Sequence, residues 1–172
     1  MTTSLDVITL STGLLIARLV LGLLMAAHGS QKLFGWFGGH GIAGTSGFFE
    51  SIGFRPGRLF ATVAALTELG SGLLIALGFL GPVGPALLVS VMIVAAVSVH
   101  WHGVFATTNG VEVPLLYAAG AAALALTGPG QFSLDAILGL GLLFTPTLVW
   151  VVLAIGILGG IGNLFARGPA SV

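Results

Sequence analysis

The stretch that decides the fold runs from Arg18 to Lys32 and reads RLVLGLLMAAHGSQK. It begins with an arginine inside a long apolar run and ends in a corner formed by His28, Gly29 and Lys32. An arginine at membrane depth costs at least about 2.5–3.5 kcal/mol on insertion scales, so it usually faces a protein interior and a partner. The deep acid of the next apolar run is Glu68. The sequence therefore predicts a helical bundle built around an Arg18–Glu68 pair and this polar corner.

The composition indicates a membrane protein. The chain has 172 residues, of which 56% are hydrophobic and 6% are charged. Soluble domains carry about 25% charged residues, so we expect a single integral membrane domain over residues 1–172. The net charge is zero, which gives no indication of a nucleic-acid partner. Because the chain has no cysteine, disulfides, thiolate metal sites and thiol relays are excluded.

Five apolar runs set the expected helices. They cover about 10–27, 59–80, 86–101, 113–127 and 146–165. The fourth run is short and spans a membrane only if it is buried among other helices. The predicted fold class is therefore all-α: a polytopic membrane four-helix bundle with an additional C-terminal hydrophobic helix, integral to the cell (plasma) membrane.

Loop charges predict the orientation. With five spans, the basic loop residues fall on one side: Lys32, Arg55, Arg58 and Arg167. The positive-inside rule then puts the amino terminus outside and the carboxyl terminus inside. Trp36 and Trp101 would lie at the inner interface and Trp150 at the outer one, as in an aromatic belt. A four-span arrangement stays open as the alternative.

Polar residues near the ends of two spans predict an interfacial pocket. His28 and Lys32 are four residues apart and share a face if the helix continues through Gly29. The alternative is that Gly29 breaks the helix. The third span ends on the same side, at His100 and His102. One interpretation is a quinone-type head-group site, where a histidine or lysine hydrogen-bonds a ring carbonyl. The alternative is ordinary interfacial polarity.

The candidate residues follow from that pocket. The predicted catalytic residues are His28 and Lys32, and the predicted substrate-binding residues are Arg18, Glu68, His100, Trp101 and His102. Glu112 lies nearby across a polar loop. His100 and His102 are two apart, so on a helix they point nearly opposite ways and do not chelate together. We therefore expect no haem or metal, and quinone as the one candidate cofactor.

Two further motifs concern structure. The segment from Gly128 to Asp135 reads GPGQFSLD and starts another helix, with Ser133 as its predicted cap. Gly156 and Gly160 form a GxxxG face in the last span, which favours close packing. This packing is either within the bundle or between copies, and the second case predicts a homo-oligomer through Gly156 and Gly160.

Three motifs in order resemble the DoxX family of small membrane proteins. They are Arg18 followed by the His28–Lys32 corner, the segment ELGSG from Glu68, and GPGQFSLD ending at Asp135. The resemblance covers about 16–138 and implies a DoxX-like core of about 10–138, with an extra helix at about 146–166. The recurrent polar positions of the family map to Arg18, His28, Lys32, Glu68 and Asp135.

The resemblance implies a function. Family members resemble the small subunit of a thiosulfate:quinone oxidoreductase, and others are linked to quinone or catechol detoxification and to oxidative-stress complexes. It therefore implies a subunit of a quinone-linked oxidoreductase, with a soluble redox partner. The alternative is a non-catalytic membrane scaffold or anchor for a soluble redox or stress-response enzyme. Small-molecule transport is a third hypothesis, but the chain offers no evident inverted repeat.

Overall fold

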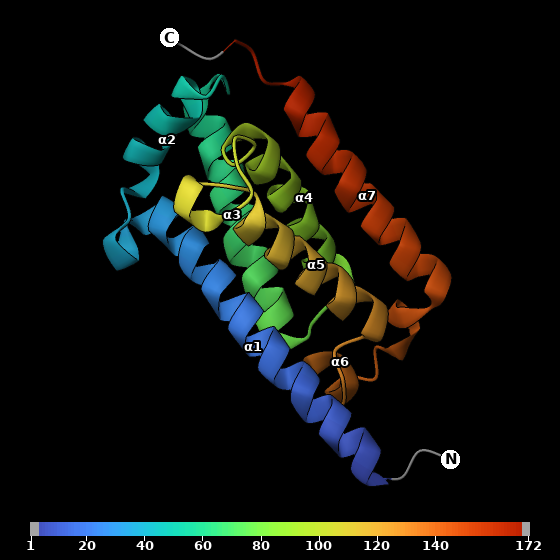
Figure 1. Ribbon diagram of the computed structural model, residues 1–172. Helices are drawn as coiled ribbons and strands as arrows, with labels where there is room; N and C mark the ends of the chain where they lie inside the picture. The colour runs from blue at the N-terminus through green and yellow to red at the C-terminus, as the bar shows by residue number, and fades with distance from the viewer. Residues whose placement is uncertain (1–3, 170–172) are drawn as a thin grey trace.

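The computed structural model describes residues 4–169 and is helical throughout, with no strand in that range (Figure 1). Its α-helices are α1 (Ser4–Phe34), α2 (Gly41–Ser51), α3 (Gly57–Leu77), α4 (Val83–Ser98), α5 (Glu112–Thr127), α6 (Leu134–Ile137) and α7 (Pro146–Phe165). Three short turns of helix join them, η1 (Trp36–Gly38), η2 (Ala106–Thr108) and η3 (Gly141–Phe144). The predicted all-α membrane-type fold is confirmed.

Five of these helices form the bundle, and they alternate in direction (Figure 1). α1, α3 and α7 are long and apolar enough to cross a membrane. α4 and α5 have 16 residues each, about 24 Å of helix, against about 30 Å of hydrocarbon. α4 packs against α3, α5 and α7, so neighbouring helices cover much of it. Because α1 begins and α7 ends at opposite ends of the bundle, the arrangement matches the expected five-run topology.

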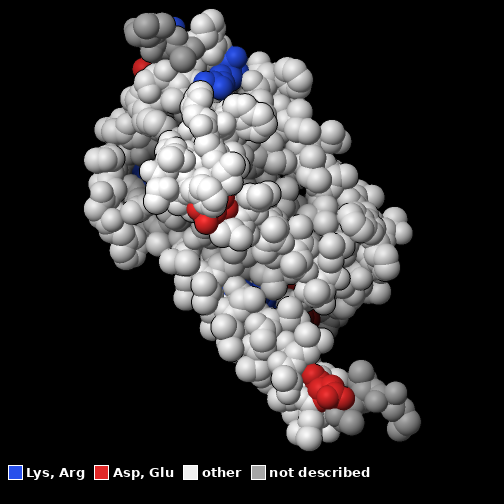
Figure 2. Space-filling view, viewed as in Figure 1, with Lys and Arg blue, Asp and Glu red and all other residues white. Residues whose placement is uncertain are grey.

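The core lies where α1, α3, α4 and α5 meet. Its buried side chains include Met25, Ile75, Leu88, Val89, Met92 and Leu124. Many large apolar side chains on the outer helix faces are exposed, among them Leu19, Leu23, Leu66 and Ile155. Figure 2 shows a surface that is almost entirely uncharged, as a lipid-facing bundle requires.

α1 does not break at the polar corner. It continues through Gly29 to Phe34, beyond the apolar run of about 10–27 that the sequence indicates. Gly29 serves close packing instead, because a Cβ there would lie 2.4 Å from the Leu69 nitrogen. A Cβ on Gly22 would likewise lie 2.5 Å from the Gly72 oxygen. The backbones of α1 and α3 therefore approach each other over small residues, as in many membrane helix pairs.

These contacts also fix the register of the two antiparallel helices. Arg18 lies opposite Gly78, where a Cβ would meet Arg18 Nη1 at 2.2 Å. Gly78 comes ten residues after Glu68, about 15 Å along a helix. The predicted Arg18–Glu68 pair is therefore wrong. The prediction took the two residues to be level because each lies near the middle of its apolar run. The contacts at Gly22 and Gly29 instead place Arg18 opposite the C-terminal end of α3.

The GxxxG face of α7 is used inside the bundle. A Cβ on Gly156 would lie 2.5 Å from the Ala86 oxygen, and one on Gly160 would lie 2.7 Å from the Ser90 oxygen. Both acceptors belong to α4, which covers this face. Packing within the bundle is thus the correct alternative, and the predicted homo-oligomer through Gly156 and Gly160 is wrong because the face is already occupied.

Basic residues gather at the end of the bundle where α7 finishes (Figure 2). Arg167 Nε donates to the Ile52 oxygen at 2.7 Å, which ties α7 to the turn before α3. Arg55 and Arg58 follow in that turn and the first turn of α3, both exposed. This clustering is what the sequence predicts for one side of the membrane. That this side faces the cytoplasm remains a prediction.

Candidate functional site

An ion pair between α1 and α3 forms the centre of the candidate site. Lys32 Nζ donates to both carboxylate oxygens of Glu68. The Glu68 side chain is 5% exposed and the Lys32 side chain is 29% exposed. The register of α1 and α3 brings them together, since Lys32 follows the close contact at Gly29 by three residues. Desolvating a carboxylate is expensive unless a partner compensates it, and Lys32 is that partner.

A cavity of about 210 Å³ opens beside this pair. Its apolar wall comes from α2, the turn after it, and α4: Phe48, Phe49, Ile52, Phe54, Val91, Val94 and Ala95. Its polar lining consists of Lys32, Glu68, Ser98 and His100. Ligand sites are concave and mostly apolar, with a few polar groups that fix orientation. The cavity has this form, and its charged pair gives it one strongly polar side.

Ser98 and His100 are the two polar uncharged residues of the cavity lining. His100 Nδ1 lies 3.2 Å from the Asn109 oxygen. If Nδ1 carries the hydrogen and donates to that oxygen, Nε2 of the neutral ring is an acceptor. Ser98 Oγ is buried and has no hydrogen-bond partner among the described residues. Ser98 lines the cavity as a residue, but its Oγ is covered by neighbouring atoms.

The structure brings together three of the residues predicted from the sequence: Lys32, Glu68 and His100. His28 is exposed and does not line the cavity. Its ring instead makes an edge-to-face contact with Tyr117 of α5, with centroids 6.2 Å apart. His28 therefore lies outside the cavity, and the structure gives no support to its predicted catalytic role.

The turn after α4 carries two further predicted residues, and neither lines the cavity. Trp101 is 69% exposed, and His102 is exposed as well. Glu112 braces the loop before α5, where its Oε2 accepts a hydrogen bond of 2.8 Å from the Ala106 nitrogen. Only the first residue of the His100–His102 segment therefore reaches the candidate site.

Sequence reasoning missed two parts of the site. Ser98 gives no sequence signal, because a single serine in an apolar helix is ordinary. The phenylalanines of α2 did give a signal, since Phe48 and Phe49 belong to an amphipathic piece that ends at Ile52. That pattern indicates an interfacial or re-entrant segment. The structure shows that this segment forms a wall of the cavity.

Arg18 lies at the other end of the bundle, in an enclosed site. It is 2% exposed, and its Nη1 and Nη2 donate to the Pro129 and Phe132 oxygens, each at 2.6 Å. A guanidinium offers several donors in a fixed fork, which suits a turn that presents two carbonyls. The void beside Arg18 measures only about 10 Å³, room for a single water at most. Arg18 therefore anchors the 128–133 loop to α1.

The helix α6 completes this anchor. Ser133 Oγ accepts a hydrogen bond of 3.1 Å from the Ala136 nitrogen, so Ser133 is the N-cap that the sequence predicts. The Asp135 carboxylate accepts from the Leu80 and Gly81 nitrogens at 3.0 Å and 2.7 Å. Asp135 is 2% exposed. Both predicted structural residues thus hold α6 against the turn that follows α3.

Within residues 4–169, no group of three or more histidine or acidic side chains is placed to hold a metal ion. The Lys32–Glu68 cavity itself presents a lysine, a carboxylate and a histidine around one largely apolar space.

The comparison with protein families completes the assignment. A model of the DoxX family matches residues 13–101, which include Arg18, the His28–Lys32 corner and Glu68. The match ends before the GPGQFSLD segment. For that segment the likeness to the DoxX family is a resemblance in sequence only. No curated protein and no solved structure is detectably similar to the chain. Because the matched segment is more than half of the 172 residues, the chain belongs to the DoxX family of membrane proteins.

Proposed function

We propose that this protein is a cell-membrane subunit of a quinone-linked oxidoreductase that binds a quinone-type head group in the Lys32–Glu68 cavity. The observation that carries the proposal is the ion pair beside an apolar cavity of about 210 Å³. Buried ionisable groups in membrane helices mark functional sites more often than not. The His100 residue supplies a further polar group in the lining.

A quinone ring fits the chemistry of this cavity. The ring is flat and apolar, so it suits the phenylalanine side chains of the wall, Phe48, Phe49 and Phe54. Its carbonyl oxygens accept hydrogen bonds, which Lys32 can donate. Lys32 also places a fixed positive charge where negative charge develops on an oxygen during reduction.

Reduction of a quinone to a quinol requires two electrons and two protons. In this proposal a soluble redox partner, or a small reduced donor, supplies the electrons. Glu68 and His100 relay the protons, since a carboxylate and an imidazole can each accept a proton and release it. The chain itself binds and orients the head group.

Titration with a benzoquinone tests the proposal. The ligand is added to the detergent-purified wild type and to the Lys32→Met, His100→Ala and His102→Ala variants. Losing one charge-assisted hydrogen bond should weaken binding about tenfold or more, so Lys32→Met should bind clearly less. His100→Ala should also bind less, because its ring lines the cavity.

His102→Ala is the matched control, because it removes the same side chain two residues further on, outside the cavity. It should bind within about twofold of the wild type, and His28→Ala should do the same. Absence of benzoquinone binding to the wild type would overturn the proposal and leave the scaffold or anchor hypothesis in first place. Equal losses in His100→Ala and His102→Ala would locate the head group elsewhere.

A further inference from the structure

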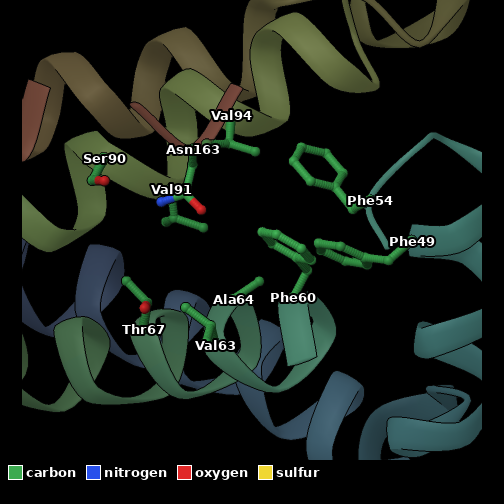
Figure 3. A pocket seen from close by; sticks show the side chains of 10 residues that line it. All are labelled: Phe49, Phe54, Phe60, Val63, Ala64, Thr67, Ser90, Val91, Val94 and Asn163. Carbon is green, nitrogen blue, oxygen red and sulfur yellow. The ribbon is translucent and has the colours of Figure 1, made fainter. Parts of the chain in front are cut away.

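A second, smaller cavity adjoins the Lys32–Glu68 cavity (Figure 3). Its volume is about 50 Å³. The two cavities share five lining residues, Phe49, Phe54, Ala64, Val91 and Val94. The smaller cavity also reaches Phe60, Val63, Thr67, Ser90 and Asn163. It therefore continues the larger cavity away from the ion pair and toward the side of the bundle.

The boundary between the two cavities is aromatic. The rings of Phe49 and Phe54 have centroids 5.7 Å apart, and those of Phe54 and Phe60 have centroids 5.2 Å apart. Figure 3 shows the three rings together at one side of the small cavity. Tilted aromatic contacts of this kind are weak individually. The hydrocarbon tail of a ligand can therefore take the place of some of these ring–ring contacts, because its own contacts with the rings are also apolar.

The small cavity reaches the outer face between α3 and α7. Both helices pack on α4, and residues of all three line the cavity, as Figure 3 shows. Val63 of α3 is 46% exposed, so its side chain lies at the outer rim. Val63 belongs to a membrane-spanning segment. The cavity therefore meets the bilayer rather than the aqueous phase.

Three helices each place a polar side chain in this otherwise apolar opening. They are Thr67 of α3, Ser90 of α4 and Asn163 of α7. Asn163 Nδ2 donates to the Gly159 oxygen at 3.2 Å, which leaves its amide oxygen as an acceptor. Polar groups at a lipid-facing surface are costly without partners. A polar head group that moves past them would supply such partners in transit.

We propose that the ligand is an amphiphile with a long hydrocarbon tail, and that it reaches the cavity laterally from the bilayer between α3, α4 and α7. This inference rests on the proposed function. The head group lies beside Lys32 and Glu68. The tail passes Ala64 and Val91 and leaves at Val63. The C-terminal helix α7, which lies outside the segment that matches the family, then forms part of the tail site.

Two benzoquinones with the same ring test this inference. One carries a decyl tail and the other carries a methyl group in its place. Binding of each is measured for the wild type, Val63→Trp and Leu66→Trp. Leu66 is the matched control, because it is 55% exposed on the same helix and lines neither cavity.

Val63→Trp should weaken binding of the decyl compound about tenfold or more, because a few methylenes lose their apolar contact. Binding of the methyl compound should change by less than about twofold. Leu66→Trp should leave both affinities unchanged. An equal loss for the two compounds in Val63→Trp, or no loss for either, would overturn the lateral tail site.

The wild type separates the two proposals. If it binds both compounds with the same affinity, the tail makes no contact and this inference fails, while the head-group site stands. If it binds neither compound, the proposed function fails together with the inference. If it binds the decyl compound more tightly, the tail site gains direct support.

A labelling experiment on the wild type avoids any folding effect of a substitution. The decyl tail carries a terminal diazirine, and the labelled peptides are mapped after irradiation. Label should concentrate near Val63 and Asn163 and disappear in excess unlabelled compound. Label spread over the outer face of α1, at Leu19 and Leu23, and insensitive to competition would count against the tail site.

Discussion

Each end of the bundle holds a cation between its helices, but the two cations are held in different ways. At one end Lys32 is paired with a carboxylate and lies beside a cavity of about 210 Å³. At the other end Arg18 donates to two backbone carbonyls and has about 10 Å³ of free space. An ion pair can exchange a partner for a ligand atom. A guanidinium held by loop carbonyls cannot do so without unfolding the loop.

This difference distinguishes residues that can contact a ligand from residues that hold the fold together. The side chains of Arg18, Ser133 and Asp135 all make hydrogen bonds to backbone groups of the chain, Arg18 through its two terminal nitrogens. Lys32 is only partly buried, and its partner Glu68 reaches the cavity wall. Of the two cations, Lys32 is therefore the functional candidate, because a cavity with room for a ligand adjoins its ion pair, and Arg18 is the structural one, because backbone carbonyls bind it.

The largest expected effect is on stability at the Arg18 end. Arg18→Met removes two charge-assisted hydrogen bonds of about 1.5–3 kcal/mol each. The loss should therefore be about 3–6 kcal/mol and appear as a large drop in Tm in detergent, measured by circular dichroism. Arg18→Lys keeps the charge but loses the fork that reaches both carbonyls, so it should fall between the wild type and Arg18→Met. A small effect of Arg18→Met would show that the loop does not depend on this anchor.

The second expected effect concerns the ion pair. Glu68→Leu alone leaves the Lys32 ammonium without its partner and should cost about 3–5 kcal/mol. The double variant Lys32→Met with Glu68→Leu should be far closer to the wild type, because no unpaired charge remains.

Combining Glu68→Leu with Arg18→Met is the matched comparison. Sites more than about 7–10 Å apart that share no partner behave additively, so these two losses should simply add. Thermal unfolding of the four single and double variants provides the test. A double variant of Arg18 and Glu68 that regained stability would mean that those two residues pair after all.

A third, smaller effect tests the register on which the comparison depends. Gly29→Ala puts a Cβ 2.4 Å from the Leu69 nitrogen, so α1 and α3 must separate, at a cost of about 1–3 kcal/mol. Gly13→Ala in the same helix is the control, since nothing lies within 4 Å of its Cβ. It should leave stability unchanged or raise it by up to about 1 kcal/mol. Equal Tm values for the two variants would argue against close α1–α3 packing.

Much of the fold follows from hydrophobic run length. The last run, 146–165, matches α7, because Pro146 starts the helix and the apolar run continues to Phe165. The Ser133 cap was also predictable, because serine is a preferred residue at the position before a helix. The end of α1 was not, because Gly29 has two opposite uses, as a helix breaker and as a packing residue. Only the position of α3 decides between them.

The candidate site was predictable in part. The sequence indicates that Lys32, Glu68 and His100 are functional, because charged and imidazole groups in apolar runs are rare. It does not give the pairing, since the register of α1 and α3 depends on contacts of Gly22 and Gly29 across two helices. Two hydrogen-bonding histidines, His28 and His102, look equivalent to His100 in the sequence. Only the rotation of their helices and turns separates them.

The most direct test of the central claim is ligand stabilisation of two matched variants. A ligand at about 100 times its Kd stabilises the folded state by about 2.7 kcal/mol. We therefore expect the decyl benzoquinone to raise the Tm of the wild type and of Asp135→Asn, although the basal Tm of Asp135→Asn should be lower because its carboxylate is replaced. The Lys32→Met, Glu68→Leu double variant should keep a basal Tm close to that of the wild type and show no rise. A rise in the double variant equal to that of the wild type, or a rise lost only in Asp135→Asn, would contradict the assignment of function to the Lys32–Glu68 cavity.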